Sequence, residues 1–466
     1  MLNPLRRHRT WWIAAALLVI LSLVLAACQP AAPAPEAQPA EGQGEAAPAA
    51  AETGGKEPVV LKFLKLNDPV EAIAFAKIEE EFRKIDGGKW SYVSIEYDTV
   101  AFRDLFPKIE TSVAAGVELD LIQADGPDMK HYAWNKVLIP LDEYFTEEEK
   151  AAFAPQSIEE GSYKGVFYGP PFMQSCSLMW YNRDFTDAAG IQPPKNLDDS
   201  WTMEEALDAW QKTTVDNDGD GTPDVWGIRW GQGTWTGDYE HGIFRRSNGE
   251  KGSPTYMGMA PDGVTFQGYF DTPEAIEAMQ FYQDMHLKYK VTPVEPIPNI
   301  FQSKKAAFVV FPDNIIGDIN NQYPDGGFNL EVTGIPYFKT QLCHTGSWHY
   351  GISANTKHFD EALAFVKFAS SKEGSRIYYE ALRQLPARLD LLNELPEYNE
   401  YPQKLVKEGF QKFGIPRIQT PGYTEYQQVF AEVAQNIASG ADAAEQMKEG
   451  AIRIEQAVAK YKGWNE

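Results

Sequence analysis

Apolar residues along this chain form short continuous runs and stretches with helical spacing. From residue 59 onward they predict strands over 59–66, 93–97 and 119–123, with helices over 69–85 and 102–115 between them. This alternation indicates a parallel sheet with helices wound on both faces and right-handed crossovers. Ligands bind such sheets beyond the carboxyl ends of the strands. Asp68 and Asp125 follow two of these ends, where each carboxylate either contacts a ligand or caps a helix.

The segment 163–182 is apolar and aromatic but has no helical period, so it predicts extended chain. Pro170 and Pro171 lack the amide hydrogens of a sheet ladder, which favours a sheet edge or a crossing between two sheets. A chain of 466 residues also exceeds what one hydrophobic core usually serves. We therefore expect two lobes joined by extended linkers, with a cleft between them.

The later part of the chain carries the same kinds of signal. It predicts a strand over 178–181 and helices over 202–213, 273–289, 359–369 and 374–382. Thr202 and Glu205 form a capping box at the first of these helices, and Thr272 precedes Pro273 at the second.

The first 57 residues predict export. Three arginines precede an apolar run over 11–27, which is typical of a signal peptide; an uncleaved signal anchor is the alternative. The run ends in Leu-Ala-Ala-Cys28, which resembles the lipobox of bacterial lipoproteins, so residues 1–28 would be the signal peptide and Cys28 the lipidated residue. Residues 29–57 are rich in Ala, Pro and Glu and predict a disordered stem. The mature protein would be anchored to the outer face of the cell membrane.

The charge of the chain excludes one class of partner. A net charge of −24 argues against nucleic acid, because phosphate neutralisation needs clustered Lys and Arg. It leaves a cationic ligand open. The three cysteines are too few for a disulfide framework.

An Asp-rich loop follows the helix over 202–213 and has the spacing of a calcium loop. Its candidate oxygen ligands are Asp216, Asp218, Asp220, Thr222 and Asp224. Gly227 stands where such loops have a bidentate Glu. The loop therefore predicts either a structural calcium site or a polar turn, and no other cofactor is expected.

Short segments in a fixed order resemble the extracellular solute-binding proteins, family 1, of bacterial ABC importers, the group that includes maltose-binding proteins. The segments are 120–123, 137–142, 168–170, 180–182, 189–194, 304–308, 334–336, 351–354, 361–369 and 386–387. The resemblance implies an α/β fold of periplasmic-binding-protein type II, with two doubly wound lobes and a hinge of three crossovers, near Pro171, Pro336 and Leu385. Lobe one would hold residues 58–171 and 338–384, and lobe two residues 172–337 and 385–466.

The resemblance also implies a function. The protein would be a monomeric receptor without catalytic residues that closes around a sugar or oligosaccharide and delivers it to the permease of an ABC importer. The same fold with another small polar solute, such as a polyamine or glycerol phosphate, is one alternative. A surface glycoside hydrolase, which needs two carboxylates at a fixed separation, is another.

A sugar site needs flat aromatic rings together with carboxylate and amide oxygens, and the chain has 12 Trp and 22 Tyr. We expect Asp68, Asp125 and Gln174 to hydrogen-bond the ligand. Trp230 or Trp235, from a Gly-rich segment, would stack on the sugar opposite Trp348, with Tyr423 closing the far end. Asp313 stands where the family often has an aromatic ligand contact, a departure that argues against stacking there.

Cys176 and Cys343 remain once Cys28 is lipidated, in an oxidising compartment. Each lies a few residues from a proposed crossover. They form either a disulfide that ties two linkers together or two buried thiols.

Overall fold

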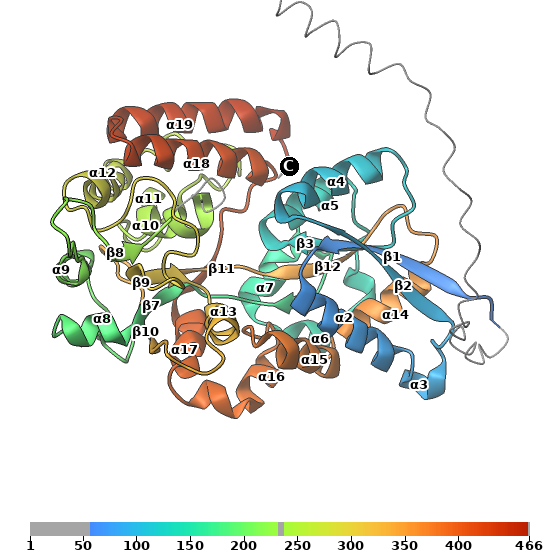
Figure 1. The fold of residues 1–466 in the computed structure, drawn as a ribbon. Helices are drawn as coiled ribbons and strands as arrows, with labels where there is room; N and C mark the ends of the chain where they lie inside the picture. Colours follow the sequence, from blue (N-terminus) through green and yellow to red (C-terminus); the bar gives the residue numbers. More distant parts are fainter. Residues whose placement is uncertain (1–55, 232–236, 465–466) are drawn as a thin grey trace, which may run out of the picture. The chain divides into compact units, whose positions relative to one another are not determined.

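The computed structural model describes residues 56–231 and 237–464. The signal peptide with Cys28, the stem up to residue 55 and Trp235 lie outside the described residues. Within the described ranges, none of the helices has the length and apolar character needed to cross a bilayer. These residues form two α/β lobes, each built around its own sheet (Figure 1).

Sheet one has five strands. In sheet order they are β2 (Val93–Val100), β1 (Val59–Leu66), β3 (Leu121–Asp125), β12 (Trp348–Ile352) and β6 (Pro171–Met173). The first three are parallel, as the sequence predicts, whereas β12 runs antiparallel to both β3 and β6. Pro171 begins β6 at the edge of the sheet, where a missing amide hydrogen is tolerated.

Both faces of sheet one are covered by helices, because successive side chains of a strand point to opposite faces. Phe63 on β1 belongs to a core that includes residues of α2, α14 and α15, whereas the adjacent Leu64 belongs to a core with residues of α4 and α5. The helices associated with this sheet are α2 (Pro69–Phe82), α3 (Ile85–Gly88), α4 (Phe102–Ala114), α5 (Met129–Trp134), α6 (Glu147–Ala151), α7 (Pro155–Glu160), α14 (Phe359–Ala369) and α15 (Lys372–Leu382).

Sheet two has four strands. In order they are β10 (Leu330–Thr333), β7 (Leu178–Asn182), β9 (Ala306–Phe311) and β8 (Trp226–Arg229). The central strand β7 is antiparallel to both neighbours, and only β8 and β9 are parallel. Met179 and Trp180 on β7 pack into different cores, so this sheet is also buried on both faces.

Helices complete the second lobe. They are α8 (Arg183–Ala188), α9 (Met203–Thr213), α10 (Ile243–Arg246), α11 (Pro254–Met257), α12 (Pro273–Leu287), α13 (Ile315–Gln322), α16 (Leu389–Glu394), α17 (Gln403–Phe413), α18 (Tyr423–Ala438) and α19 (Ala443–Val458). The capping box of Thr202 and Glu205 is confirmed at α9, and Thr272 caps α12 with Pro273 in its first turn. The remaining short elements are β4 (Ser162–Tyr163), β5 (Val166–Phe167), η2 (Gly126–Asp128), η3 (Asp142–Tyr144), η4 (Gly237–Gly242), η5 (Pro396–Asn399) and η6 (Ala459–Tyr461).

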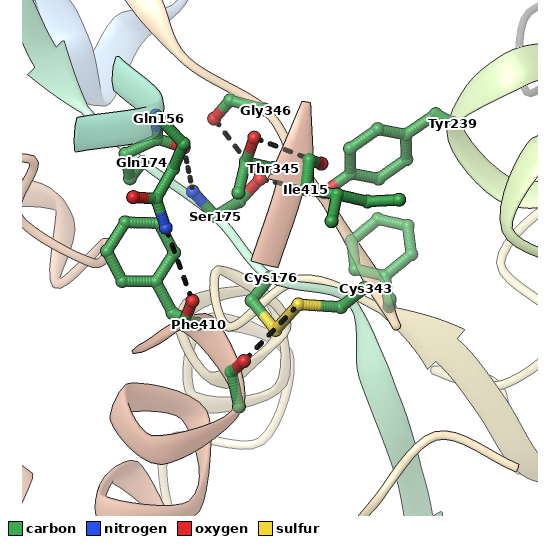
Figure 2. The surroundings of a disulfide bond; sticks show 12 residues. Gln156, Gln174, Ser175, Cys176, Tyr239, Cys343, Thr345, Gly346, Phe410 and Ile415 are labelled. Atoms are coloured by element: carbon green, nitrogen blue, oxygen red, sulfur yellow. Dashed lines mark hydrogen bonds between the residues drawn. A yellow bond between two sulfur atoms is a disulfide. The ribbon is translucent and has the colours of Figure 1, made fainter. Parts of the chain in front are cut away.

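The chain passes from one sheet to the other through short extended segments. Residues 174–177 connect β6 of sheet one to β7 of sheet two. Beside them β11 (Cys343–Thr345) pairs in parallel with β13 (Gly414–Pro416). Cys176 forms a bridge with Thr345 and a disulfide with Cys343, with 5.4 Å between the two Cα atoms of the disulfide (Figure 2). The disulfide therefore ties two connecting segments together.

Breaking this disulfide should destabilise the protein. The two cysteines are 167 residues apart, and the bridge restricts the unfolded chain accordingly. We expect the Cys343→Ser variant to lose about 2 to 5 kcal/mol of unfolding free energy in a denaturant titration, and reduced wild-type protein to lose the same amount. Alkylation of the denatured, unreduced protein should leave Cys176 and Cys343 unlabelled; labelling of both would contradict the bridge.

Candidate functional site

A cavity of 340 Å³ lies between elements of the two lobes. On the side of sheet one, Asp125 is the last residue of β3 and pairs in the sheet with Trp348, the first residue of β12. Met173 ends β6 next to Trp348, and Phe102 begins α4 just after β2. This wall therefore lies along the edge of the sheet where the parallel strands end and the antiparallel β12 begins, which is the edge at which an α/β sheet presents its ligand sites.

The second lobe supplies the opposite wall of the cavity. Asp313 and Asn314 follow the end of β9, Tyr239 lies in η4, Arg417 follows β13 and Gln427 lies in α18. The cavity is thus closed only when loops from both lobes meet.

A buried ion pair joins the two walls. Arg417 Nη1 donates to Asp125 Oδ2 at 3.0 Å, and Arg417 Nη2 donates to the other carboxylate oxygen. Burial would lower the pKa of Arg417, but the negative charge of Asp125 holds it well above its usual value. The guanidinium also lies over the rings of Tyr239 and Tyr423, at 5.6 and 5.5 Å from their centroids. Arg417 is therefore held in one position while it lines the cavity.

Aromatic rings form a large part of the lining. The partly buried Trp348 meets Phe102 edge to face, with 6.0 Å between ring centroids. Across the cavity the hydroxyl of Tyr239 is 2.8 Å from Ser175 Oγ. Gly346 lies beside this contact, and a Cβ atom there would come within 2.7 Å of Ser175 Oγ and 3.0 Å of the Tyr239 ring. A glycine at this position lets the two connecting segments approach Tyr239 closely.

A buried carboxylate, Glu160 at the end of α7, organises the connecting segments. It accepts hydrogen bonds from Gln174 Nε2 at 3.0 Å, Thr345 Oγ1 at 3.0 Å and Ser347 Oγ at 2.5 Å. Burial raises the pKa of Glu160, and these donors oppose that shift. Gln174, which we expected to contact the ligand, is instead part of this network and does not line the cavity.

The structure brings together three of the predicted ligand residues, Asp125, Asp313 and Trp348. Asp68 lies elsewhere: it is exposed and caps α2 by accepting from the amides of Val70 and Glu71 at 2.8 and 2.9 Å. The alternative role considered for this residue, helix capping, is the one observed.

Two aromatic residues lie behind the cavity or away from it. Tyr423 is buried beside Arg417 and donates to Gln427 Oε1 at 2.9 Å, so it supports the wall without lining it. Trp230 is fully buried in the core of the second lobe, edge to face with Phe244, and this corrects the expectation that it stacks on a ligand. Glycines around an indole did not keep it at the surface, because Trp210 of α9 and Phe244 of α10 pack against its ring.

Sequence reasoning missed Arg417, Tyr239 and Gln427. Arg417 had a signal, since it follows the short apolar segment 414–416 much as Asp125 follows its strand. Tyr239 and Gln427 had none, because a tyrosine and a glutamine are unremarkable in their local segments.

The Asp-rich loop lies on the surface of the second lobe, between α9 and β8. Carboxylate oxygens of Asp216, Asp218 and Asp224 lie within 4.8 Å of one another. Asp216 also accepts the amides of Gly219 and Gly221, at 2.8 and 2.9 Å, which fixes the turn. Oxygen donors in this arrangement fit the coordination preference of calcium.

Two sheets that meet through short connecting strands, with a cavity lined from both, define a solute-binding protein of the periplasmic type II fold. Residues 75–406 match the family described as bacterial extracellular solute-binding proteins. The match covers well over half of the chain, and the protein belongs to this family. The resemblance inferred from short segments is thereby confirmed.

The relatives with matching sequences have low identity to this chain. A putative binding protein of Brucella abortus is 28% identical over 121 residues, which are 26% of this chain and 29% of that protein. The maltotriose-binding protein of Pyrococcus abyssi is 24% identical over 308 residues, 64% of this chain and 61% of that protein. The chain thus matches less than two thirds of the length of either relative.

Solved structures share the fold at low sequence identity. An ABC transporter solute-binding protein of Thermotoga lettingae, solved with α-D-tagatose, superposes with a TM-score of 0.72 at 21% identity, covering 86% of this chain and 100% of that one. The maltose/maltodextrin-binding domain MalE of Bdellovibrio bacteriovorus, solved with maltotriose, gives 0.69 at 21% identity, covering 84% and 98%.

Removing one partner of the ion pair between the walls should open the cavity. Asp125→Ala leaves Arg417 buried without its carboxylate, which should disfavour the contact between the lobes by about 3 to 5 kcal/mol. Small-angle X-ray scattering should then show a larger radius of gyration than for the wild type. The double variant Asp125→Ala/Arg417→Ala should return toward the wild-type value, because no charge is left unpaired.

The exposed pair of Arg453 and Glu432 provides a control. Glu432→Ala should leave the scattering unchanged, since exposed ion pairs contribute little. A wild-type scattering curve for Asp125→Ala would show that the pair does not hold the lobes together.

Proposed function

We propose that this protein is a lipid-anchored extracellular receptor that captures a sugar or short oligosaccharide by hinge closure and delivers it to the permease of an ABC importer. The observation that carries the proposal is the lining of the cavity between the lobes. Aromatic rings from both walls line this cavity together with carboxylate, amide, hydroxyl and guanidinium groups.

This lining suits the chemistry of a saccharide. Sugar rings have apolar faces that pack on flat aromatic rings such as Trp348 and Tyr239. Their hydroxyl edges need acceptors and donors, which Asp313, Asn314 and Gln427 supply. The volume of 340 Å³ is near the lower end of the range for small-molecule sites, about 300 to 1,000 Å³, and favours a short saccharide.

The division of the lining between two lobes supports capture by closure. A ligand in contact with only one lobe leaves half of these groups unused, so the ligand favours the arrangement in which both lobes contact it. The sugar ligands of the structurally similar proteins from Thermotoga lettingae and Bdellovibrio bacteriovorus support the same class of ligand for this chain.

Two alternatives are less well supported. Glycerol phosphate would need a cation that is free to bind phosphate, and the one guanidinium in the described lining already holds Asp125. A glycoside hydrolase needs two carboxylates that are free to act on the glycosidic bond, and Asp125 is engaged by Arg417 on both oxygens. A polyamine remains as a competing ligand for the same cavity.

Truncating Trp348 should weaken sugar binding without unfolding the protein. A thermal-shift screen of mono- and oligosaccharides identifies the ligand, and calorimetry then measures its affinity for Trp348→Ala. We expect a loss of about 2 to 4 kcal/mol, or thirtyfold and more, as for other buried aromatic anchors.

Trp230→Ala is the matched control for this test. Because Trp230 fills a core, its removal should lower the unfolding free energy by about 3 to 5 kcal/mol. The proposal fails if Trp348→Ala binds the ligand as tightly as the wild type does. It also fails if no saccharide in the screen shifts the melting temperature.

We also propose that the Asp-rich loop holds a structural calcium ion through Asp216, Asp218, Asp220, Asp224 and the carbonyl of Thr222. Three of these carboxylates already converge, and a divalent cation would offset their mutual repulsion.

Chelation should therefore lower the melting temperature reversibly. EDTA should destabilise the wild type, and excess calcium should restore it. Magnesium should restore it less well, because Mg²⁺ demands near-ideal octahedral geometry and gives up its water reluctantly. The Asp216→Asn variant should respond weakly to either reagent. Identical melting curves for the wild type with and without EDTA would rule out the calcium site.

A further inference from the structure

Among the described residues, Asp313 has no charged partner. The two other residues of the described cavity lining that carry full charge, Asp125 and Arg417, have one. Asp125 and Arg417 neutralise each other through two hydrogen bonds. Asp313 therefore leaves the lining with a net negative charge whenever its carboxyl group is ionised.

The polar groups near the Asp313 carboxylate are neutral: the hydroxyl of Tyr398, its own backbone amide and the amide of Leu385. The hydroxyl of Tyr398 in η5 donates to Asp313 Oδ2 at 3.3 Å, and Oδ1 has no hydrogen-bond partner among the described residues. In the ranges 56–231 and 237–464, no Lys, Arg or His forms an ion pair with this carboxylate. The five residues between these ranges, Gln-Gly-Thr-Trp-Thr, include no basic side chain.

A carboxylate that is 2% exposed and lacks a counter-ion is destabilised in its charged form. Burial accordingly raises the pKa of Asp313 to about 7. Such a group gains most from a ligand that brings a cation into the cavity, since the cation compensates the charge that the protein leaves unpaired.

We propose that the physiological ligand is an amino sugar whose protonated amine pairs with Asp313. This inference rests on the proposed function and specifies its ligand. The rings of Tyr239 and Trp348 in the same cavity accept a sugar face and also favour a nearby cation. The net charge of −24 attracts cationic solutes to the protein surface.

Matched ligands test this proposal by calorimetry. Glucosamine, galactosamine and mannosamine, together with their β-linked and α-linked disaccharides, are each compared with the all-hydroxyl sugar and with the N-acetylated sugar. These three forms differ only in the substituent at carbon 2 of each ring. We expect an amino form to bind the wild type at least tenfold more tightly than both of its neutral counterparts, as for a hydrogen bond between charged groups.

The Asp313→Asn variant keeps the shape of the side chain and removes its charge. It should lose the preference for the amine and bind the neutral counterpart with little change. Asp318→Asn is the matched control. It makes the same chemical change five residues away, at an exposed position of α13, and should keep the wild-type preference.

The outcomes separate this inference from the proposed function. Neutral sugars that bind as tightly as their amino forms overturn the amino-sugar ligand while leaving the sugar receptor intact. A preference for the amine that persists in Asp313→Asn also overturns it. Putrescine and spermidine are the remaining probes. If they bind in a way that depends on Asp313 and no saccharide binds, both the amino-sugar ligand and the sugar receptor are overturned.

Discussion

The ion pair between Asp125 and Arg417 is the constraint on which the site depends. Each group is almost fully buried, and either charge without the other would be strongly destabilising. Asp125 ends a strand of sheet one, whereas Arg417 follows β13, which pairs with β11 beside the connecting segments. The pair therefore fixes how the two walls of the cavity meet. It also engages one carboxylate and one guanidinium of the cavity lining, and Asp313 is the other carboxylate of the described lining.

The connecting segments impose a second constraint. Residues 174–177 and 343–347 are tied by the disulfide of Cys176 and Cys343, and Glu160 accepts hydrogen bonds from side chains on both segments. Ser175 and Gly346, on the same segments, line the cavity. The connecting segments thus also form part of the cavity lining, so a motion of the lobes about these segments alters the cavity directly.

Aromatic content alone does not tell which aromatic residues line the cavity. Trp230 and Trp348 are both tryptophans near glycines, yet one fills a core and the other lines the cavity. The difference lies in what packs over each strand. Helices α9, α10 and α12 cover the region of Trp230, whereas Trp348 begins β12 at the end of a sheet, where the chain turns toward the other lobe. The indole of Trp348 therefore lines the cavity because of its place at a strand end.

The sequence by itself determined the local elements. Strand 59–66 and helix 359–369 were predicted with their observed bounds, and the caps at Thr202 and Thr272 are those of the structure. These signals are local, since periodicity and capping depend on residues within about one helical turn. Only the tertiary structure decided the site. Asp125 and Arg417 are 292 residues apart in the sequence. Asp313 is buried beside η5, where the hydroxyl of Tyr398 donates to it. Such contacts arise where lobes meet, and no periodicity in the chain encodes which loops will face each other across a cleft.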